Sequence, residues 1–342
     1  MKAALVVGAR PQFVKAAALL PALRAHGETS FVHTGQHTDP AMVEAQFASL
    51  GLPSPDRRLS AAGGRAQRLG GLVRDLAETF ESDGIDRVVV MGDTDSTLAG
   101  ALAASFSGLP LVHVEAGARS GERDLPEERN RIVVDELSDL LLCSTEAHAA
   151  QVPGGVCVGD VMADVLMARE SEIRAQAPRN CEPYAVLTLH RAGNVDNPER
   201  VADVLSGLAG AGMRVIFPVH PRLKRTDFPA PIEAVAPLAY REFLALVAGA
   251  AFVLTDSGGL QKEAYLLGVP CITLRDATEW GGTIDAGWNV LTGTDPARIS
   301  AAVASPPRSN QRPTLYGDGH AAERIATAVA DLPRIYRHSG LP

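Results

Sequence analysis

The sequence has few cysteines and no pattern that would make them metal ligands or disulfide partners. Only four of its 342 residues are cysteine, widely spaced and without a C-x-x-C pair. This excludes a disulfide framework and favours buried free thiols in a reducing compartment. His33 and His37 lack zinc-ligand spacing, so we expect no metal site. The four cysteines are Cys143, Cys157, Cys181 and Cys271.

Clusters of basic residues and long apolar runs are also missing. The formal net charge is -8 and no Lys/Arg cluster occurs, which excludes a nucleic-acid partner because phosphates require a basic surface. No run of about 20 apolar residues is present that could cross a bilayer. The apolar stretch within residues 1–10 spans only about six residues, shorter than the core of a signal peptide. We therefore expect a cytoplasmic protein with no membrane partner.

Two glycine-rich phosphate-binding motifs are absent as well. Neither G-x-G-x-x-G nor G-x-x-x-x-G-K-[ST] occurs in the chain. These motifs are the fingerprints of dinucleotide binding and of the ATP-binding P-loop. We therefore expect no cofactor.

What the chain does contain is an alternation of short apolar runs and amphipathic stretches. This alternation is typical of repeated β-α units around a parallel sheet, and 342 residues are enough for two domains of about 150 residues. We predict two doubly wound α/β domains, a linker over residues 169–183, and helices after Pro198, Tyr240 and Gly259. The predicted strands are Ala3–Val7, Ser30–His33, Arg87–Met91, Leu111–Val114, Leu140–Cys143, Val156–Val158, Ala185–Leu189, Arg214–Pro218, Phe252–Leu254 and Cys271–Leu274.

Two strand ends carry features suited to an anion. Ligands of open parallel sheets bind at the carboxyl ends of strands. After the first strand, Arg10 and Lys15 flank a helix start with Pro11 expected at its first position, although an ordinary surface turn fits them equally well. In the second domain, Ser257, Gly258 and Gly259 lead a strand into a helix, where backbone N–H groups can approach a pyrophosphate.

Acidic residues collect at strand ends of the first domain. Asp93 and Glu115 each follow an apolar run, and a carboxylate ending a buried strand must find partners or face a cleft. Neighbouring, partly desolvated acids can act as base and acid at neutral pH. Glu127 and Glu128 open a helical run and are also compatible with a helix-capping pair. His190 follows a strand of the second domain and is either part of the site or a structural histidine.

Taken together, these segments resemble the non-hydrolysing UDP-N-acetylglucosamine 2-epimerase family over nearly the whole chain. The motifs keep the order and spacing of that family. They are GARPQFVK at 8–15, TGQH at 34–37, GDTDSTLAGALAA at 92–104, HVEAGARS at 113–120, PEERNR at 126–131, LTLHRAGNVDN at 187–197, PVHPR at 218–222, TDSGGLQKEA at 255–264 and YGDGHAAERI at 316–325.

The resemblance implies a fold and an assembly. The fold is the glycosyltransferase-B type, two Rossmann-like doubly wound domains with the active site in the interdomain cleft. The first domain would cover residues 1–170, with a C-terminal helix at about 318–338 packing back on it. The second, UDP-binding domain would cover 171–317, and the protein would be a homodimer.

The resemblance also implies an activity and its residues. The activity is the interconversion of UDP-GlcNAc and UDP-ManNAc, by elimination of UDP to a 2-acetamidoglucal and re-addition. The alternatives are a hydrolysing 2-epimerase releasing UDP and free ManNAc, and a glycosyltransferase of the same fold. The implied catalytic residues are Asp93, Glu115, Glu127 and His190, and the implied UDP-binding residues are Arg10, Lys15, Ser257, Gly258, Gly259, Glu263 and Arg275. Residues matching a substrate-activation site in some members are Gln36, Arg191 and His220.

Several positions depart from the family pattern. Gln12 and Lys262 stand where many members have glutamate, as does Gly193. Trp280 and Gly281 replace an Arg-Pro pair whose arginine contacts the nucleotide, so we expect Arg275 to substitute for it. These departures leave the decoration of the sugar open.

Overall fold

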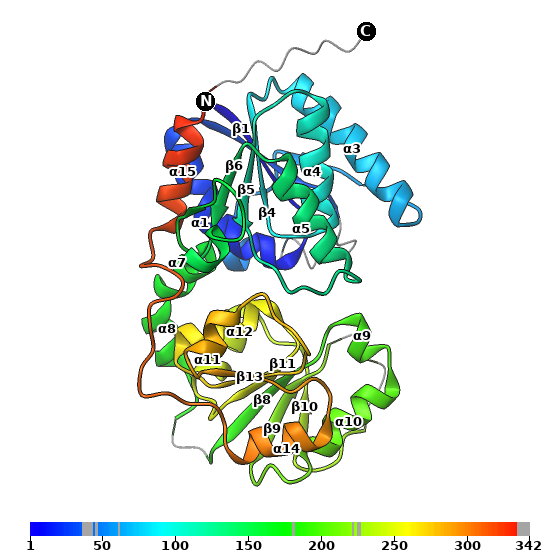
Figure 1. Ribbon diagram of the computed structural model, residues 1–342, viewed down its shortest axis with the longest axis vertical. Coiled ribbons are helices and arrows are strands. Elements are labelled where there is room, and N and C mark those ends of the chain that lie inside the picture. The colour runs from blue at the N-terminus through cyan, green and yellow to red at the C-terminus, as the bar shows by residue number, and fades with distance from the viewer. Residues whose placement is uncertain are drawn as a thin grey trace. The chain divides into compact units, whose positions relative to one another are not determined.

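The chain folds into two compact units. The computed structural model describes residues 1–35, 44, 47–60, 62–179, 182–220, 222–223 and 227–333. One unit comprises the described residues up to Val165 together with those from Tyr316 onward, and the other comprises those of Leu166–Leu315. Each unit is built on one parallel sheet with helices on both faces (Figure 1). The predicted architecture of two doubly wound α/β domains is confirmed.

The first unit holds a seven-stranded sheet. Its strands are β1 (Lys2–Val7), β2 (Glu28–His33), β3 (Arg57–Arg58), β4 (Arg87–Met91), β5 (Leu111–Ala116), β6 (Leu140–Cys143) and β7 (Val156–Cys157). Its helices are α1 (Arg10–His26), α3 (Arg65–Ser82), α4 (Asp95–Phe106), α5 (Pro126–Leu137), α6 (Glu146–Ala149) and α15 (Ala321–Asp331), and the chain leaves the unit within α7 (Val161–Met167). The strand order is β3-β2-β1-β4-β5-β6-β7, so the direction of winding reverses between β1 and β4. Such a switch point is where doubly wound sheets bind ligands.

Both faces of this sheet are covered, which explains why its strands are continuously apolar. Helices α3, α4 and α5 lie on one face, and α1 and α15 pack together on the other (Figure 1). On the α3–α5 side, Val6 and Val90 of the strands contact Leu76 and Phe80 of α3, all fully or almost fully buried. The sheet is therefore a rigid base for the turns at its carboxyl edge.

Helix α15 is fastened to the first unit at both ends. The carboxylate of Asp164 accepts hydrogen bonds from the backbone N–H groups of Ala321 (3.1 Å) and Ala322 (2.7 Å) at the start of the helix. The guanidinium of Arg87, which is 4% exposed, donates to backbone carbonyl oxygens at the other end, including that of Leu332 at 3.0 Å. A carboxylate at the N-terminus and a cation at the C-terminus both complement the helix dipole.

The second unit holds a six-stranded sheet of the same winding. Its strands are β8 (Tyr184–Thr188), β9 (Arg214–Pro218), β10 (Ile232–Val235), β11 (Val253–Thr255), β12 (Cys271–Thr273) and β13 (Asn289–Leu291). Its helices are α8 (Glu170–Gln176), α9 (Ala192–Val195), α10 (Pro198–Leu208), α11 (Tyr240–Ala248), α12 (Gly258–Leu267), α13 (Gly281–Asp285) and α14 (Pro296–Ala304). The order β10-β9-β8-β11-β12-β13 places the switch point between β8 and β11.

Alternate residues of these strands contribute to two separate hydrophobic cores, one on each face of the sheet. Leu187 and Phe217 face α10 and α14, whereas Val186 and Val253 face α8, α11 and α12. Asn197 caps α10, because its side-chain oxygen accepts from the backbone N–H groups of Glu199 (3.0 Å) and Arg200 (3.3 Å), and Pro198 occupies the first helical turn as predicted.

Ten predicted strands are present with small shifts of their ends, and two expectations need correction. The short strands β3, β10 and β13 were not predicted, because β3 consists of two arginines and the apolar residues of β10 and β13 do not form a run of more than two. Residues 169–183 were predicted to be a linker, but α8 occupies part of them and the buried Ile173 packs into the second unit. Ile173 and the hydrogen bond from Arg174 to the Leu267 carbonyl oxygen (3.0 Å) join this segment to the second unit.

The described cysteines are free thiols, as the sequence predicts. Cys143, Cys157 and Cys271 are free, and burial raises the pKa of the Cys143 and Cys271 thiols to about 12. Cys157 is only half-buried, and Cys181 lies outside the described residues. Within the described part of the chain, no helix combines the length and hydropathy that a bilayer crossing demands.

Candidate active site

The turn after β1 is tightly packed and opens helix α1. A Cβ atom at Gly8 would lie 1.9 Å from the side-chain oxygen of Ser96, so only glycine fits there. The helix begins at Arg10, which places Pro11 at its second position rather than the predicted first. Arg10 is exposed at the helix start, while Lys15 is buried one turn further on. The helix start and two cations therefore meet at the switch point of the first sheet.

Lys15 forms a buried ion pair with Glu115. Glu115 has a backbone φ of 71°, the one positive φ among the non-glycine residues that the structure describes. A register shift between Val114 and Ala116 marks a bulge in the β5–β6 pairing at this residue. Bulges and left-handed non-glycine residues are concentrated at functional sites, where they redirect a side chain. The backbone thus turns the Glu115 carboxylate toward the carboxyl edge of the sheet.

Asp93 is held by residues of helix α5. Its carboxylate forms an ion pair with Arg131, whose side chain is 4% exposed, and its carbonyl oxygen accepts from the Asn130 side chain at 2.9 Å. Glu128 is buried and accepts from the backbone N–H groups of Ser120 (3.0 Å) and Gly121 (3.0 Å). Glu128 therefore stabilises the loop between β5 and α5 through hydrogen bonds to its backbone.

Glu127 differs from its neighbour Glu128 in its environment. It lies in the first turn of α5 and its side chain is exposed. Asp93 and Glu115, by contrast, are bonded to cations. The first unit therefore presents two ion-paired carboxylates and one exposed carboxylate from the segments at its carboxyl edge.

Gln12, one of the departures from the family pattern, is a structural residue. Its side-chain oxygen accepts from the backbone N–H groups of Gly8 (2.7 Å) and Ala9 (2.9 Å), and its amide nitrogen donates to the carbonyl oxygen of Met91 (2.7 Å) and to Thr97 (3.0 Å). The side chain is 2% exposed and is fully used by these bonds. It joins the turns after β1 and β4 directly.

In the second unit, the switch point presents His190 on a buried aspartate. The Nδ1 atom of His190 lies 2.7 Å from a carboxylate oxygen of Asp256, and 42% of the His190 side chain is exposed. Asp256 also accepts from the backbone N–H of Arg191 (3.0 Å) and from the side chain of Asn194 (3.1 Å). Burial acts to raise the pKa of the Asp256 carboxyl, but the His190 hydrogen bond and charge outweigh it and lower that pKa. With Nδ1 bonded to the carboxylate, Nε2 is the nitrogen left for a ligand.

The start of helix α12 has the geometry of an anion site. Ser257 is the N-cap residue and its hydroxyl accepts from the backbone N–H of Leu260 at 3.3 Å. Gly258 and Gly259 form the first helical positions, where backbone N–H groups lack partners within the helix. A Cβ atom at Gly258 would lie 2.6 Å from the side-chain oxygen of Glu279, so the turn is closely packed against that side chain. This arrangement suits the phosphate oxygens of a nucleotide.

Two further predicted residues line the same end of the second unit. Glu263 is 5% exposed and accepts a hydrogen bond from the Tyr240 hydroxyl at 2.7 Å. Arg275, which follows β12, is 6% exposed and forms an ion pair with Glu279 at 2.8 Å. Both side chains are therefore held in place from within the second unit.

The residues expected at a substrate-activation site are only partly described. Arg191 follows His190 directly, and the His190 and His220 rings are 6.4 Å apart between centroids. Gln36 lies outside the described residues. Gly193 is exposed with no atom within 4 Å of its Cβ position, so the absence of a glutamate there leaves a solvated surface.

Within each unit, the predicted residues gather at one edge of the sheet. The Cβ position of Gly92, which precedes Asp93, lies 3.8 Å from both Glu115 Oε2 and Lys15 Nζ. Residues that the sequence analysis missed connect them, namely Asn130, Arg131, Asp135 and Asp256. Asp256 comes one residue after an apolar run, so the strand-end rule applied to Asp93 would have found it. The other three lie within helix α5, where no strand end singles them out, although Asn130 and Arg131 belong to the PEERNR motif.

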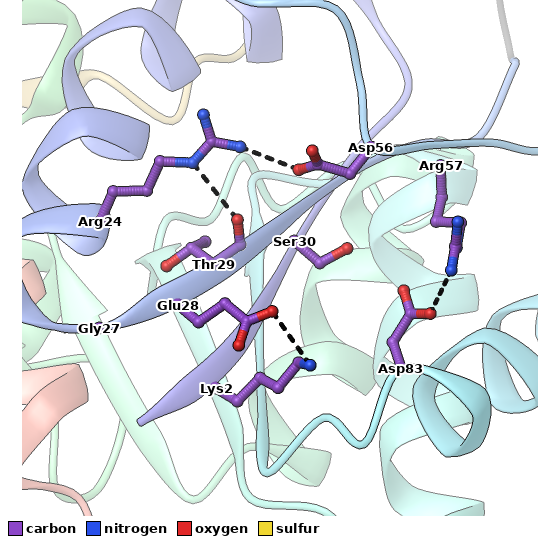
Figure 2. A pocket seen from close by; sticks show the side chains of 9 residues that line it. All are labelled: Lys2, Arg24, Gly27, Glu28, Thr29, Ser30, Asp56, Arg57 and Asp83. Carbon is purple, nitrogen blue, oxygen red and sulfur yellow. Dashed lines mark hydrogen bonds and ion pairs between the residues drawn. The ribbon is translucent and has the colours of Figure 1, made fainter.

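A cavity of about 650 Å³ lies at the opposite, amino end of the first sheet. Figure 2 shows three ion pairs around it, and its lining therefore has as many cations as acids. It offers no surplus positive charge for a diphosphate. The pairs are Lys2 with Glu28 (3.0 Å), Arg24 with Asp56 (2.9 Å) and Arg57 with Asp83 (2.5 Å).

Among the described residues, no three His, Cys, Asp or Glu side chains are grouped so that they could hold a metal ion. In the first unit, carboxylates at the carboxyl edge could transfer a proton, and in the second unit the N-terminus of α12 could hold an anion.

Comparison with known proteins identifies relatives over almost the whole length. The family model described as UDP-N-acetylglucosamine 2-epimerase matches residues 21–330. The UDP-2,3-diacetamido-2,3-dideoxy-D-glucuronate 2-epimerase of Pseudomonas aeruginosa is 38% identical, covering 97% of this chain and 100% of the relative. The UDP-N-acetylglucosamine 2-epimerase of Methanocaldococcus jannaschii is 35% identical, covering 95% of this chain and 98% of the relative.

A solved structure agrees with this relationship. The crystal structure of the Methanocaldococcus jannaschii UDP-GlcNAc 2-epimerase in complex with UDP-GlcNAc and UDP matches with a TM-score of 0.87 and 32% sequence identity. The match covers 96% of this chain and 99% of that one. The similarity thus extends through both units.

Proposed function

The chain belongs to the UDP-N-acetylglucosamine 2-epimerase family, and from this premise we propose that it interconverts UDP-GlcNAc and UDP-ManNAc without hydrolysis. As an epimerase it is an isomerase. The observation that carries the proposal is the pair of carboxylates, Asp93 and Glu115, at the switch point of the first sheet. Glu115 is turned there by a bulge and a left-handed backbone, which an ordinary strand end does not need.

The chemistry at the sugar explains these residue types. The C2–H of a hexosamine has no adjacent carbonyl to acidify it, so inversion at C2 without a redox step begins by breaking the C1–O bond. The UDP leaves with that electron pair, and positive charge develops on the ring. Loss of the C2 proton to a carboxylate then gives a 2-acetamidoglucal. Protonation at C2 from the opposite face and return of UDP to C1 give the epimer.

We propose that the second unit binds the departing diphosphate. The N-terminus of α12 and the side chains of Ser257 and His190 would donate hydrogen bonds to its oxygens. Glu263, steadied by Tyr240, would accept from hydroxyl groups of the ribose. Arg275 is held by Glu279 and would add positive charge near the nucleotide.

We propose that the first unit works on the sugar and on the charge that develops there. Asp93 and Glu115 would take and return the C2 proton on opposite faces, with Glu127 assisting. The cations paired with them, Arg131 and Lys15, hold these carboxylates in place. Arg10, at the exposed start of α1, would contact the diphosphate together with Lys15. The active enzyme would be a cytoplasmic homodimer.

A second candidate substrate comes from the relatives. The Pseudomonas aeruginosa protein named for UDP-2,3-diacetamido-2,3-dideoxy-D-glucuronate is 38% identical to this chain, compared with 35% for the Methanocaldococcus jannaschii enzyme. Both named substrates carry an acetamido group at C2, so the same elimination applies to both. We therefore propose a UDP-2-acetamido sugar as the substrate class, with UDP-GlcNAc as the first substrate to test.

Proton NMR of the reaction in D₂O tests the proposal. Incubation with UDP-GlcNAc alone should incorporate deuterium at C2 and produce UDP-ManNAc. A parallel incubation with UDP-2,3-diacetamido-2,3-dideoxy-D-glucuronate tests the second candidate substrate. Release of UDP with free ManNAc would instead identify a hydrolysing enzyme. An unchanged C2 configuration without an acceptor, together with sugar transfer when one is added, would identify a glycosyltransferase.

A further inference from the structure

A buried histidine joins the turn that carries Asp93 to helix α5. His113 lies on β5 and is 0% exposed. Its Nε2 atom is 2.8 Å from the carbonyl oxygen of Gly92, and its Nδ1 atom is 2.6 Å from a carboxylate oxygen of Asp135. A carbonyl oxygen can only accept, so Nε2 donates its proton to Gly92. The imidazole therefore spans two segments and leaves no nitrogen for a ligand.

Asp135 continues this connection to the segment after Glu115. Its second carboxylate oxygen accepts from the backbone N–H of Gly117 at 3.2 Å and pairs with Arg119 at 2.6 Å. Burial acts to raise the pKa of the Asp135 carboxyl, but the His113 hydrogen bond and the charges of His113 and Arg119 outweigh it and lower that pKa. One ionised carboxylate thus holds the segments after β4 and after β5.

The peptide that His113 holds is the one that precedes Asp93. Gly92 has a φ of 69°, its N–H donates to the carbonyl oxygen of Val114 at 3.0 Å, and its own carbonyl accepts from His113. Gly92 also lies beside Glu115, because its Cβ position is 3.8 Å from Glu115 Oε2. Any rotation of this peptide changes the distance between the Asp93 and Glu115 carboxylates.

We propose that His113 and Asp135 are positioning residues that set the spacing of the Asp93 and Glu115 carboxylates. The proposal rests on the proposed function, in which these carboxylates act on opposite faces of one carbon. A proton removed from one face and returned on the other requires both groups within a few tenths of an ångström of their working positions. His113 and Asp135 act through hydrogen bonds to the backbone and do not touch the sugar.

Two substitutions of His113 separate its two hydrogen bonds. In His113→Gln, the amide nitrogen can reach the place of Nε2 and still donate to Gly92. In His113→Asn, the shorter amide reaches only the place of Nδ1, so the bond to Gly92 is lost. Asp135→Asn keeps the shape of the side chain and removes the charge that joins His113 to Arg119. Glu136→Gln, an exposed position on the same helix, is the matched control.

The experiment measures kcat and KM for UDP-GlcNAc, the affinity for UDP, and the UDP and 2-acetamidoglucal released per turnover. We expect His113→Asn and Asp135→Asn to lower kcat about 100-fold, the scale for a displacement of about 1 Å, with KM and UDP affinity within about threefold of wild type. More glucal should escape per turnover, because a slower return of the proton leaves the intermediate more time to dissociate. His113→Gln should recover at least a tenth of the wild-type kcat, and Glu136→Gln should match wild type.

Other outcomes would overturn either the positioning role or the proposed function, and the measurements distinguish the two cases. A kcat within about twofold of wild type in His113→Asn and Asp135→Asn overturns the positioning role. Equal losses in His113→Asn and His113→Gln, with unchanged glucal release, also overturn it, since a general packing defect would produce them. Should His113→Asn not fold, Asp135→Asn and His113→Gln decide by the same readouts. A wild-type chain that incorporates no deuterium at C2 of either candidate substrate overturns the proposed function instead.

Discussion

The ammonium nitrogen of Lys262 lies 3.9 Å from the centroid of the Trp280 ring. Lys262 is 1% exposed and Trp280 3% exposed, so the contact is buried and a cation–π interaction there is stronger than at a surface. These are two of the positions at which the chain departs from the resembled family, where Glu and Arg are expected. The two departures therefore contact each other, and the tryptophan provides a neutral face for the cation of α12.

This pair supports the start of α12, and its loss should weaken nucleotide binding. The Cβ position of Gly258 is 3.1 Å from Trp280 Nε1. We expect Trp280→Leu to lower the free energy of unfolding by about 2–4 kcal/mol through cavity formation and loss of the Lys262 contact. It should also reduce the affinity for UDP about tenfold or more, because the backbone N–H groups of the turn lose their support. Urea denaturation and titration calorimetry measure the two effects.

Trp280→Phe is the matched control for this prediction. The phenyl ring retains a face for Lys262, so the loss of stability and of UDP affinity should be smaller than in Trp280→Leu. Equal effects of the two substitutions would show that only the volume of the side chain matters.

Asp93 and Glu115 should be needed for turnover and not for UDP binding. We expect Asp93→Asn and Glu115→Gln to lower kcat at least about 100-fold, the scale of lost acid–base catalysis. The affinity for UDP should stay within a few-fold of wild type, because the residues proposed to hold the diphosphate are mostly in the second unit. Steady-state kinetics and UDP titration give both quantities. Unchanged turnover in both variants would refute the assignment.

The Glu115 variant needs a stability measurement as well. Glu115→Gln leaves the buried Lys15 without its carboxylate partner, and breaking a buried ion pair costs about 3–5 kcal/mol. A variant that is folded at the assay temperature but inactive supports a role in the reaction. An inactive Glu115→Gln protein that is unfolded leaves Asp93→Asn, whose carboxylate is half-buried, as the deciding variant.

The strands and the residues at their carboxyl ends were accessible to sequence reasoning because both depend on local composition. Buried parallel strands are continuous apolar runs, and the residues that follow them lie at the carboxyl edge of their own sheet, Asp93 in the first unit and His190 in the second. The short strand β10, Ile-Glu-Ala-Val, is interrupted by a charged residue, so its sequence is not a continuous apolar run. Helix α8 shows the same limit, since tertiary contacts such as the packing of Ile173 make it a part of the second unit.

The supporting residues were less accessible, because their roles depend on contacts between distant segments. In the sequence, Asp135 cannot be distinguished from the other charged residues of its helix, and only the fold shows that His113 of β5 lies beside it. Lys262 and Trp280 appeared as two unrelated departures, and only the fold brings them together. Gln12 illustrates the reverse case, in which a suspected determinant of the substrate proves to be a fully bonded structural residue.

The buried Asp256 should make stability depend on pH in the acid range. Hydrogen bonds and charge from His190 hold the pKa of the Asp256 carboxyl below its ordinary value despite burial. The unfolded chain therefore binds the proton first as the pH falls, so the stabilisation is complete above about pH 4 and is lost as the pH falls through the folded-state pKa. We expect the unfolding free energy of wild type to fall more steeply below about pH 4 than that of Asp256→Asn. Parallel slopes from urea denaturation would contradict this.

Arg87 should be a major source of stability for the first unit, because it fastens the end of helix α15. Its buried guanidinium pairs with Asp86 at 2.8 Å and donates to the carbonyl oxygen of Leu332 at 3.0 Å. Arg87→Met removes these charge-assisted bonds and leaves buried acceptors unsatisfied, so we expect a loss of about 2–4 kcal/mol in urea denaturation. Arg74→Met, which breaks an exposed pair with Asp75, should leave the urea denaturation curve close to that of wild type. Comparable losses in the two variants would mean that α15 is held by its apolar contacts with α1 alone.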